Sequence, residues 1–325
     1  MIRLLLYMMI TTMLCSCTGA QRNTGSVAEE AAESYQKVTF DTDSAMNFLL
    51  MQTAAGPRVP GSGAHAATAR FLTDKLASYH PDTLLVQNPQ ITVPGTDKSV
   101  TISNIFARWG AEKPAHILLL AHWDTRPFAD NDPDAANHSI PFDGANDGAS
   151  GVAVLLEVAR NLAQRLPDNI GVDLLLTDLE DSGISNDDDS WCLGSQYFAD
   201  NLPYQPGQFP RYAILLDMVG GKNALFHREA FSDRLAHDVV DHVWAAAAQS
   251  GFGDKFVNMY GNPINDDHIP LNRTGIPTID IIENNNSATG SFNPTWHTMD
   301  DNYDNIDPKS INAVGQTILN LIYNE

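Results

Sequence analysis

The segment 116–121, which ends in Ile-Leu-Leu-Leu-Ala, restricts the fold of this chain most, because it is short, continuous and apolar. Successive side chains of a strand point to opposite faces of its sheet, so a strand without polar alternation must be covered on both faces. Helices on the two sides of one sheet provide that cover. The sequence therefore predicts a three-layer α/β/α domain.

Hydrophobic periodicity and turn residues predict alternating helices and strands from about residue 43 to residue 323. The predicted strands are Thr83–Val93, Val100–Trp109, His116–Ala121, Val172–Thr177, Tyr212–Met218 and Thr278–Ile282. The predicted helices are residues 43–56, His65–Tyr79, Gly151–Leu166, Leu193–Ala199, Ser232–Ser250 and Pro308–Tyr323. Because no linker or repeat interrupts this pattern, we expect residues 35–325 to form a single domain.

Acidic residues outnumber basic ones, with 40 Asp and Glu against 19 Lys and Arg, which gives a formal net charge of −21. Nucleic-acid phosphates are neutralised by Lys and Arg in the proteins that bind them. A chain this acidic repels such phosphates. Nucleic-acid binding is therefore excluded as a class of function.

The first residues predict export. Arg3 supplies a positive charge, and residues 4–14 form an apolar run that is too short for a permanent membrane span. The following Leu14-Cys15-Ser16-Cys17 is similar to the lipobox of bacterial lipoproteins, in which the last cysteine is acylated. We expect residues 1–16 to be a lipoprotein signal peptide and Cys17 to carry a lipid anchor. An ordinary cleaved signal that ends near Ala20 is the alternative.

Residues 17–34 are rich in Gly, Ser, Thr, Asn, Ala and Glu and predict a lipidated tether. No acidic cluster follows Cys17, which favours a bacterial envelope location facing the periplasm. Removal of the signal and acylation of Cys17 would leave Cys192 as the only thiol, so no internal disulfide is expected. We expect Cys192 to be a small buried hydrophobic residue rather than a nucleophile.

Acidic and histidine residues follow the predicted central strands or precede a predicted helix. These residues are His122 and Asp124, Asp147, Glu180 and Asp181, Asp217, and His297. The carboxyl ends of parallel strands meet at one edge of a sheet, so these side chains are expected to lie close together. One or two imidazoles with several carboxylates suit a metal site, and Zn²⁺ fits this ligand set best.

Each of these residues also has a simpler interpretation. Asp147 could be the N-cap of the helix that follows it, and the Glu180-Asp181 pair could lie in a solvated loop. The acidic run 130–134 is similar to the start of a calcium loop, but Ala135 stands where that loop requires glycine. The placement of so many carboxylates at strand ends favours the metal site over the simpler interpretations.

Six segments resemble the zinc aminopeptidase and glutaminyl cyclase superfamily, and the last two resemble its type II (animal and bacterial) glutaminyl cyclases. The segments are Ala121-His122-Trp123-Asp124-Thr125, residues 144–151, residues 178–181, Leu216-Asp217, residues 265–271 and residues 296–302. The resemblance extends over residues 43–323. It implies a zinc aminopeptidase-like fold with a mixed, mostly parallel sheet, and it makes residues 35–325 a catalytic domain.

The resemblance also implies roles for individual residues. Asp147, Asp181 and His297 would bind one Zn²⁺, Glu180 would be the acid/base, and Asp217 and Asp266 would orient the amine of the substrate. Trp296 and Phe292 would line the pocket. The animal enzymes have an aromatic residue a few positions after the acidic pair, whereas here Ser182-Gly183-Ile184 follows and Trp191 comes later, so whether Trp191 reaches the pocket stays open. The implied reaction converts the N-terminal Gln, and slowly Glu, of peptides and proteins to pyroglutamate. The chain departs from the animal pattern at Asp181, where Glu is usual, and at Asp280, where the animal enzymes have His.

Two other functions stay open at this point. A two-zinc aminopeptidase would use His122 and Asp217 around a second metal ion, with Asp147 able to bridge the two ions. Asp124 would bind that second ion or support its ligands. A lipid-anchored peptide-binding protein without catalysis would not need a base beside the metal, so the presence of Glu180 argues against it.

Overall fold

The computed structural model describes residues 38–205 and 207–325, which fall in one compact unit, Lys37–Glu325. The predicted signal peptide, the tether and Cys17 lie outside the described residues, so those predictions stay untested. No helix of the described part of the chain has both the length and the apolar character needed to cross a bilayer.

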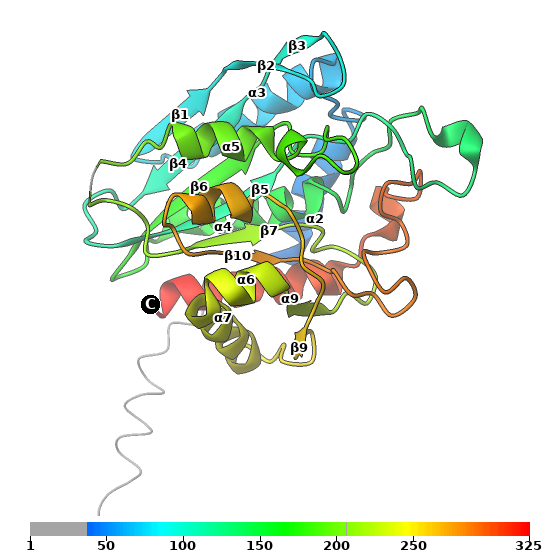
Figure 1. Cartoon of the computed structure of the whole chain (residues 1–325). Coiled ribbons are helices and arrows are strands. Elements are labelled where there is room, and N and C mark those ends of the chain that lie inside the picture. The colour runs from blue at the N-terminus through cyan, green and yellow to red at the C-terminus, as the bar shows by residue number, and fades with distance from the viewer. Residues whose placement is uncertain (1–37, 206) are drawn as a thin grey trace, which may run out of the picture. The chain divides into compact units, whose positions relative to one another are not determined.

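A six-stranded mixed sheet forms the centre of this unit (Figure 1). Its strands, in spatial order, are β1 (Thr83–Gln87), β4 (Asn104–Trp109), β6 (Gly171–Thr177), β5 (His116–His122), β7 (Ala213–Leu216) and β10 (Thr278–Ile281). The β1–β4 and β4–β6 pairs are antiparallel, and the pairs β6–β5, β5–β7 and β7–β10 are parallel. The prediction of a mixed, mostly parallel sheet is confirmed.

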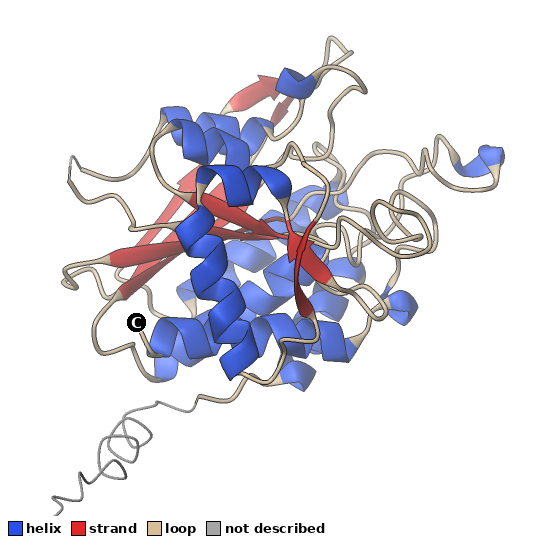
Figure 2. Cartoon of the chain, turned by 60° about the horizontal axis from the view of Figure 1, so that its bottom comes forward, coloured by secondary structure: helices blue, strands red, loops and turns tan. Residues whose placement is uncertain are grey.

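Helices cover both faces of the sheet, as Figure 2 shows. Alternate residues of β5 belong to two separate apolar clusters, Ile117 and Leu119 to one, Leu118 and Leu120 to the other. The first cluster includes residues of α2 (Thr42–Thr53), α3 (Gly63–Ala77), α4 (Ala149–Gln164), α7 (His237–Gln249) and α9 (Pro308–Tyr323). The second includes residues of α5 (Leu193–Asp200) and α8 (His268–Arg273). The three-layer prediction is confirmed.

Three predicted elements are divided in the structure. The predicted strand at 83–93 ends at Gln87 and resumes as β2 (Gln90–Thr92), and the next one is divided into β3 (Ser99–Thr101) and β4. β2 and β3 pair with each other in a separate two-stranded sheet, which the apolar pattern does not encode. The predicted helix 232–250 is interrupted at Ala236, whose ψ of 46° is not helical, giving α6 (Ala230–Leu235) and α7.

Several short elements were not predicted. They are β8 (Phe226–Arg228), β9 (Phe256–Tyr260), α8, and the 3₁₀ turns η1 (Ala135–Asn137), η2 (Asp188–Ser190) and η3 (Tyr303–Asn305). Each has only three to six residues, so it carries too few residues for a periodic pattern.

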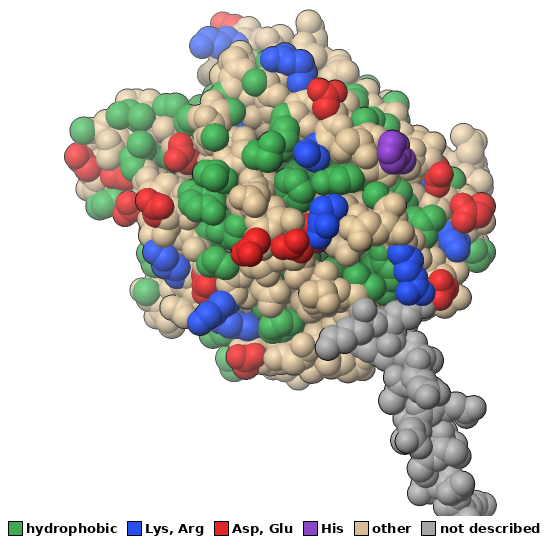
Figure 3. Space-filling model, turned by 180° about the vertical axis from the view of Figure 1, so that it is seen from behind, with side chains coloured by type: hydrophobic (Ala, Val, Ile, Leu, Met, Phe, Trp, Pro, Cys, Tyr) green, Lys and Arg blue, Asp and Glu red, His purple; other side chains and the backbone are tan. Residues whose placement is uncertain are grey.

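On the face shown in Figure 3, the Lys and Arg side chains are scattered among acidic and apolar ones.

Candidate active site

The candidate site lies where the parallel strands end. β5 ends at His122, the Asp178–Asp181 segment follows β6, and Asp217 follows β7 directly. These ends border a cavity of about 250 Å³. The cavity is lined by Asp147, Glu180, Asp181, Asp188, Trp191, Asp217, Met218, Pro263, Ile264, Asn265, Asp266, Ile282, Phe292, Trp296 and His297. The prediction that strand ends gather the carboxylates at one rim agrees with this geometry.

Asp147, Asp181 and His297 form a buried triad whose ligand atoms lie within 4.8 Å of one another. His297 Nε2 lies 3.4 Å from Asp147 Oδ2 and 3.2 Å from Asp181 Oδ1. The other carboxylate oxygen of Asp181 is buried and has no hydrogen-bond partner. Because a buried carboxylate oxygen without a partner is costly, this arrangement fits a cation. Carboxylates and imidazole are zinc-type ligands, and three such ligands match the number that catalytic zinc sites take from the protein.

The local backbone directs the Asp147 side chain towards Asp181 and His297 rather than towards the first turn of α4. Gly148, not Asp147, occupies the N-cap position of α4, and no side chain caps that helix end. Gly148 has φ of +90°, and a Cβ atom there would lie 2.7 Å from the Asp124 carbonyl oxygen, so only glycine fits. Asp301 accepts hydrogen bonds from the backbone N–H groups of Asn146 and Asp147. The simpler interpretation of Asp147 as an N-cap is therefore wrong.

Asp124 holds the Glu180-Asp181 pair in place. Its two carboxylate oxygens accept hydrogen bonds from the backbone N–H groups of Glu180, at 3.0 Å, and of Asp181, at 3.3 Å. Burial raises the pKa of Glu180 well above its ordinary value, although the charge of His122 opposes the rise. Burial also raises the pKa of Asp181 to about 6, against the attraction of His297. Both carboxyl groups therefore hold protons more strongly than exposed ones.

His122 lies among three carboxylates. Its Nε2 is 3.0 Å from Asp147 Oδ1 and 3.2 Å from Asp217 Oδ1, and its Nδ1 is 3.5 Å from Asp124 Oδ1. The atoms of His122, Asp147 and Asp217 form a second group with metal-ligand spacing. Burial alone would raise the pKa of Asp147, but hydrogen bonds with His122 and His297 lower it below the ordinary value.

Asp266 comes from the segment before α8 and faces the same cavity. Burial, and then the charge of Asp217, raise its pKa well above the ordinary value. Glu180, Cys192 and Asp266 lie close enough together to form a third group of ligand-type atoms. Cys192 is buried as predicted, and its Sγ lies 3.5 Å from Glu180 Oε1.

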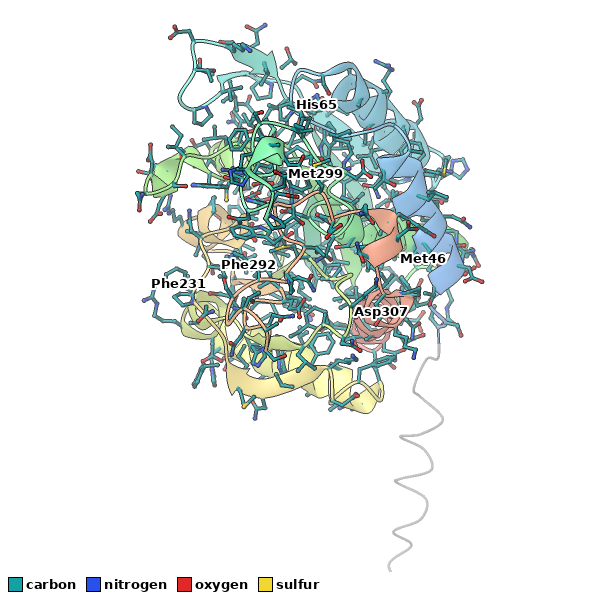
Figure 4. The ribbon with its side chains drawn as sticks, turned by 90° about the vertical axis from the view of Figure 1, so that its right-hand side faces the viewer. Met46, His65, Phe231, Phe292, Met299 and Asp307 are labelled. Carbon is teal, nitrogen blue, oxygen red and sulfur yellow. The ribbon has the colours of Figure 1, made fainter. Side chains whose placement is uncertain are left out.

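Aromatic side chains line one part of the cavity. The Trp296 ring stacks on His297 at 4.0 Å between centroids, and the ring of Phe292 lies 4.5 Å from that of Trp296. Figure 4 labels Phe292 on the loop between β10 and α9. Trp191, whose position the sequence left open, lines the same cavity. The three expected zinc ligands, Glu180, Asp217, Asp266 and the three aromatic residues therefore all line the cavity, whereas His122 and Asp124 contact these residues without lining it.

Two residues beside the site were not predicted as parts of it. Asp130 Oδ1 lies 3.2 Å from His297 Nδ1, and Arg126 holds Asp130 with two hydrogen bonds. Asp130 belongs to the acidic run that is similar to a calcium loop, so the signal was visible but was assigned to another kind of site. His297 lies 167 residues further along the chain, and no local pattern links the two.

Four non-glycine residues next to or within the site have left-handed backbone angles. They are Leu179, Cys192, Met218 and His297, with φ of +56°, +58°, +46° and +55°. The first three adjoin Glu180, Trp191 and Asp217 in the sequence. Such angles cost about 1 kcal/mol or more each in side-chain-bearing residues. The rim of the cavity is therefore held in a strained conformation by its surroundings.

The family model that matches this chain is described as peptidase family M28, and it matches residues 104–322. That range contains Asp147, Asp181 and His297. Among curated proteins, the glutaminyl-peptide cyclotransferase of Gloydius blomhoffii is 25% identical over 247 residues. The match covers 67% of this chain and 64% of that protein, so the chain spans less than two thirds of that relative's length.

Solved structures of bacterial proteins are similar over most of the chain. A glutaminyl cyclase of Bacteroides thetaiotaomicron, solved with N-acetylhistamine bound, is 43% identical with a TM-score of 0.85. The match covers 89% of this chain and 100% of that chain. A leucine aminopeptidase precursor from the same species is 42% identical, with a TM-score of 0.84, and the match covers 90% and 99% of the two chains.

Proposed function

The chain belongs to peptidase family M28, and from this premise we propose that it is a zinc-dependent glutaminyl-peptide cyclotransferase. This acyltransferase converts the N-terminal Gln of peptides and proteins, and more slowly Glu, to pyroglutamate. The observation that carries the proposal is the cavity, in which a metal triad, buried Glu180 and an aromatic wall surround about 250 Å³. Pockets for drug-sized ligands are about 300–1,000 Å³, so this one suits a single amino-acid side chain.

The reaction joins two parts of one residue. The α-amine nitrogen of the N-terminal Gln attacks its γ-carboxamide carbon, the C–N bond to the amide nitrogen breaks, and ammonia leaves. Zn²⁺ bound by Asp147, Asp181 and His297 would polarise the γ-carbonyl oxygen as a Lewis acid. The aromatic side chains Trp296, Phe292 and Trp191 hold the flexible side chain in the bent conformation that the ring requires.

Glu180 carries the proton. Ring formation removes a proton from the amine, and the departing ammonia needs one, so a single carboxylate can accept the first and donate it to the second. Because burial raises the pKa of Glu180 well above its ordinary value, the group is a stronger base than an exposed carboxylate. Such tuning towards the working pH makes a general acid/base more effective.

Asp217 and Asp266 orient the amine. Burial raises the pKa of both groups, and the charge of Asp217 raises that of Asp266 further, so both hold protons more strongly than exposed carboxyl groups. A carboxylate oxygen of either residue can accept a hydrogen bond from the amine. Together the two groups position the nitrogen for attack.

We propose one zinc ion per chain. His122 already contacts Asp147 and Asp217, so a second ion would have to replace these hydrogen bonds. Metal analysis after dialysis against trace zinc is expected to give close to one zinc per chain. Two tightly held ions, with one lost in His122→Ala, would instead support the two-zinc aminopeptidase.

One assay separates the candidate functions. The purified protein is incubated with peptides that begin with Gln and with matched peptides that begin with Leu. The cyclotransferase releases ammonia from the Gln peptides and no free amino acid from the Leu peptides. Free leucine would identify an aminopeptidase. The absence of product from both peptides would support the non-catalytic peptide-binding protein.

We also propose that Cys17 carries a lipid that anchors the enzyme in a bacterial envelope on the periplasmic side. The lipobox spacing supports this proposal. Cys17→Ala is expected to remain soluble or unprocessed while the catalytic domain keeps its activity. A Cys17→Ala protein that still partitions into detergent after signal cleavage would contradict the proposal.

A further inference from the structure

Arg126 is a buried cation beside the site, with 3% of its surface exposed, and the proposed reaction gives it no task. It follows the end of β5 by four residues. Its Nε and Nη2 donate to the two carboxylate oxygens of Asp130, at 3.0 and 2.7 Å. Its Nη1 donates to the carbonyl oxygens of Asp181, at 3.2 Å, and Gly183, at 3.4 Å. One guanidinium group therefore holds two separate loops.

The first loop, which carries Asp130, contacts His297. Asp130 Oδ1 lies 3.2 Å from His297 Nδ1, so a proton on Nδ1 is held by Asp130 and Nε2 is left free to bind a metal ion. The backbone supports the same contact, since the N–H group of Asn131 donates to the His297 carbonyl oxygen at 3.1 Å. Arg126 thus fixes the orientation of His297 through Asp130.

The second loop carries Asp181 and the wall of the cavity. The carbonyl bond to Arg126 fixes the backbone from which the Asp181 carboxylate projects. The guanidinium group also lies 5.0 Å from the ring centroid of Trp191, within the range of a cation–π contact. Trp191 Nε1 also donates a hydrogen bond to the Ile184 carbonyl oxygen. The ring packs against Gly183, where a Cβ atom would clash with it.

We propose that Arg126 is a positioning residue that sets two metal ligands and the Trp191 wall of the cavity as one unit. The inference rests on the proposed function for its kinetic consequence, but not for its effect on the metal. Arginine is required because only its planar group donates in several directions while presenting a face for stacking. A lysine at position 126 would keep the positive charge but lose the planar set of N–H donors.

The chain offers a matched control at the other end of the sheet. Arg108 donates to both carboxylate oxygens of Asp173, at 2.9 and 2.8 Å, and Asp173 Oδ1 lies 3.0 Å from His116 Nδ1. The Arg108 guanidinium group also lies 5.7 Å from the ring centroid of Phe106 and 5.2 Å from that of Tyr204. This group repeats the His–Asp–Arg contacts of the site without touching a candidate metal ligand.

The test measures how fast zinc leaves the zinc-loaded protein when excess chromogenic chelator is added. Substitution of a residue that orients a metal ligand typically weakens metal binding by about 10–100-fold. Arg126→Lys is therefore expected to release zinc faster by about that factor, and Arg108→Lys at the wild-type rate. With saturating zinc and a Gln peptide, Arg126→Lys is expected to raise KM more than it lowers kcat, because Trp191 loses its support.

If Arg126→Lys fails to fold, Asp130→Asn replaces it in the test, because the Asp130 side chain is partly exposed. This variant should also release zinc faster than the wild type. Zinc release from Arg126→Lys at the wild-type rate would overturn the inference. Equal acceleration by Arg108→Lys would overturn it too, because the effect would then be general destabilisation. If the wild type cyclises no Gln peptide while only the substitutions at 126 and 130 speed zinc release, the metal-positioning role stands and the proposed function fails.

Discussion

The two ends of β5 can be compared directly, because each adjoins a His–Asp–Arg group. At the amino end, Asp173 is fully buried and joins His116 to Arg108. At the carboxyl end, Asp130 joins His297 to Arg126, and its side chain is 35% exposed. His297 also directs its second nitrogen at the carboxylates of Asp147 and Asp181.

The difference lies in what remains free after the contacts are made. The group at the amino end joins three strands of the sheet, β4, β5 and β6, and contributes to stability. The group at the carboxyl end leaves one imidazole nitrogen among carboxylates, one of which has a buried oxygen without a partner. The same residue types therefore stabilise the fold at one end and prepare a binding site at the other.

The largest effect is expected from Glu180→Gln, which keeps the size of the side chain and removes the base. General acid–base catalysis contributes about 10²–10⁴-fold, so kcat for Gln peptides should fall by at least that order while zinc stays bound. Steady-state kinetics together with metal analysis check both parts. Normal turnover by this variant would rule out the proton transfer through Glu180.

Asp181→Asn should fail in a different way from its neighbour. A neutral amide is a poorer zinc ligand than a carboxylate, so this variant should lose zinc on dialysis and regain part of its activity at high zinc concentration. Zinc titration followed by activity measures the loss. If Glu180→Gln loses zinc and Asp181→Asn keeps it, the two roles are exchanged.

At the amino end, Asp173→Asn should reduce stability and leave the site intact. The buried carboxylate accepts from Arg108 and His116, and loss of hydrogen bonds to charged groups costs about 1.5–3 kcal/mol. Asp130→Asn, with its partly exposed side chain, should cost less than about 1 kcal/mol of folding stability. Denaturant unfolding of the two variants compares them. A larger loss in Asp130→Asn would contradict the assignment of stability to the amino end.

Two glycines extend the comparison with a smaller effect. A Cβ atom on Gly183 would lie 2.1 Å from the Trp191 ring, and one on Gly171 would lie 2.2 Å from His116. Gly183→Ala should displace Trp191 and raise KM by about 2–13-fold, which corresponds to the loss of an aromatic contact worth about 0.5–1.5 kcal/mol. Gly171→Ala should lower the unfolding temperature without changing KM. A KM change of equal size in both variants would show that the effect is not specific to the cavity wall.

The smallest effect concerns His242, close to the amino ends of the parallel strands. A hydrogen bond to Glu325, at 2.8 Å, raises the pKa of His242. A raised histidine pKa stabilises the fold fully below the unfolded pKa, near 6.5, and the contribution disappears as the pH rises through the folded pKa. Since the side chain is half exposed, His242→Asn should cost less than about 1 kcal/mol at pH 6 and nothing at pH 9. Denaturant unfolding at the two pH values tests this, and an equal loss at both would contradict it.

The sequence predicts the central sheet well because burial on both faces of β5 shows directly in its composition. It also predicts the carboxylates at the strand ends, since chain topology alone brings those ends together. The break between β1 and β2 was missed, because it depends on the pairing of β2 with β3. Arg126 and Asp130 were missed because their contacts with Asp181 and His297 form between loops far apart in the sequence. Asp147 was ambiguous, since an aspartate before a helix has the same appearance whether it caps the helix or binds a metal.

The left-handed residues at the rim have a consequence for efforts to make this protein more heat-stable. Replacement of Leu179 or Met218 by glycine would remove an unfavourable backbone angle, but both side chains are buried, so the change would also leave a cavity that costs more stability than the angle does. The same change gives the chain before Glu180 or after Asp217 more conformations to visit. Because catalysis depends on reacting groups held within a fraction of an ångström, a rim relaxed in this way would lose turnover as well as stability. Searches for stabilising substitutions are better directed at the amino end of the sheet, where the contacts serve the fold alone.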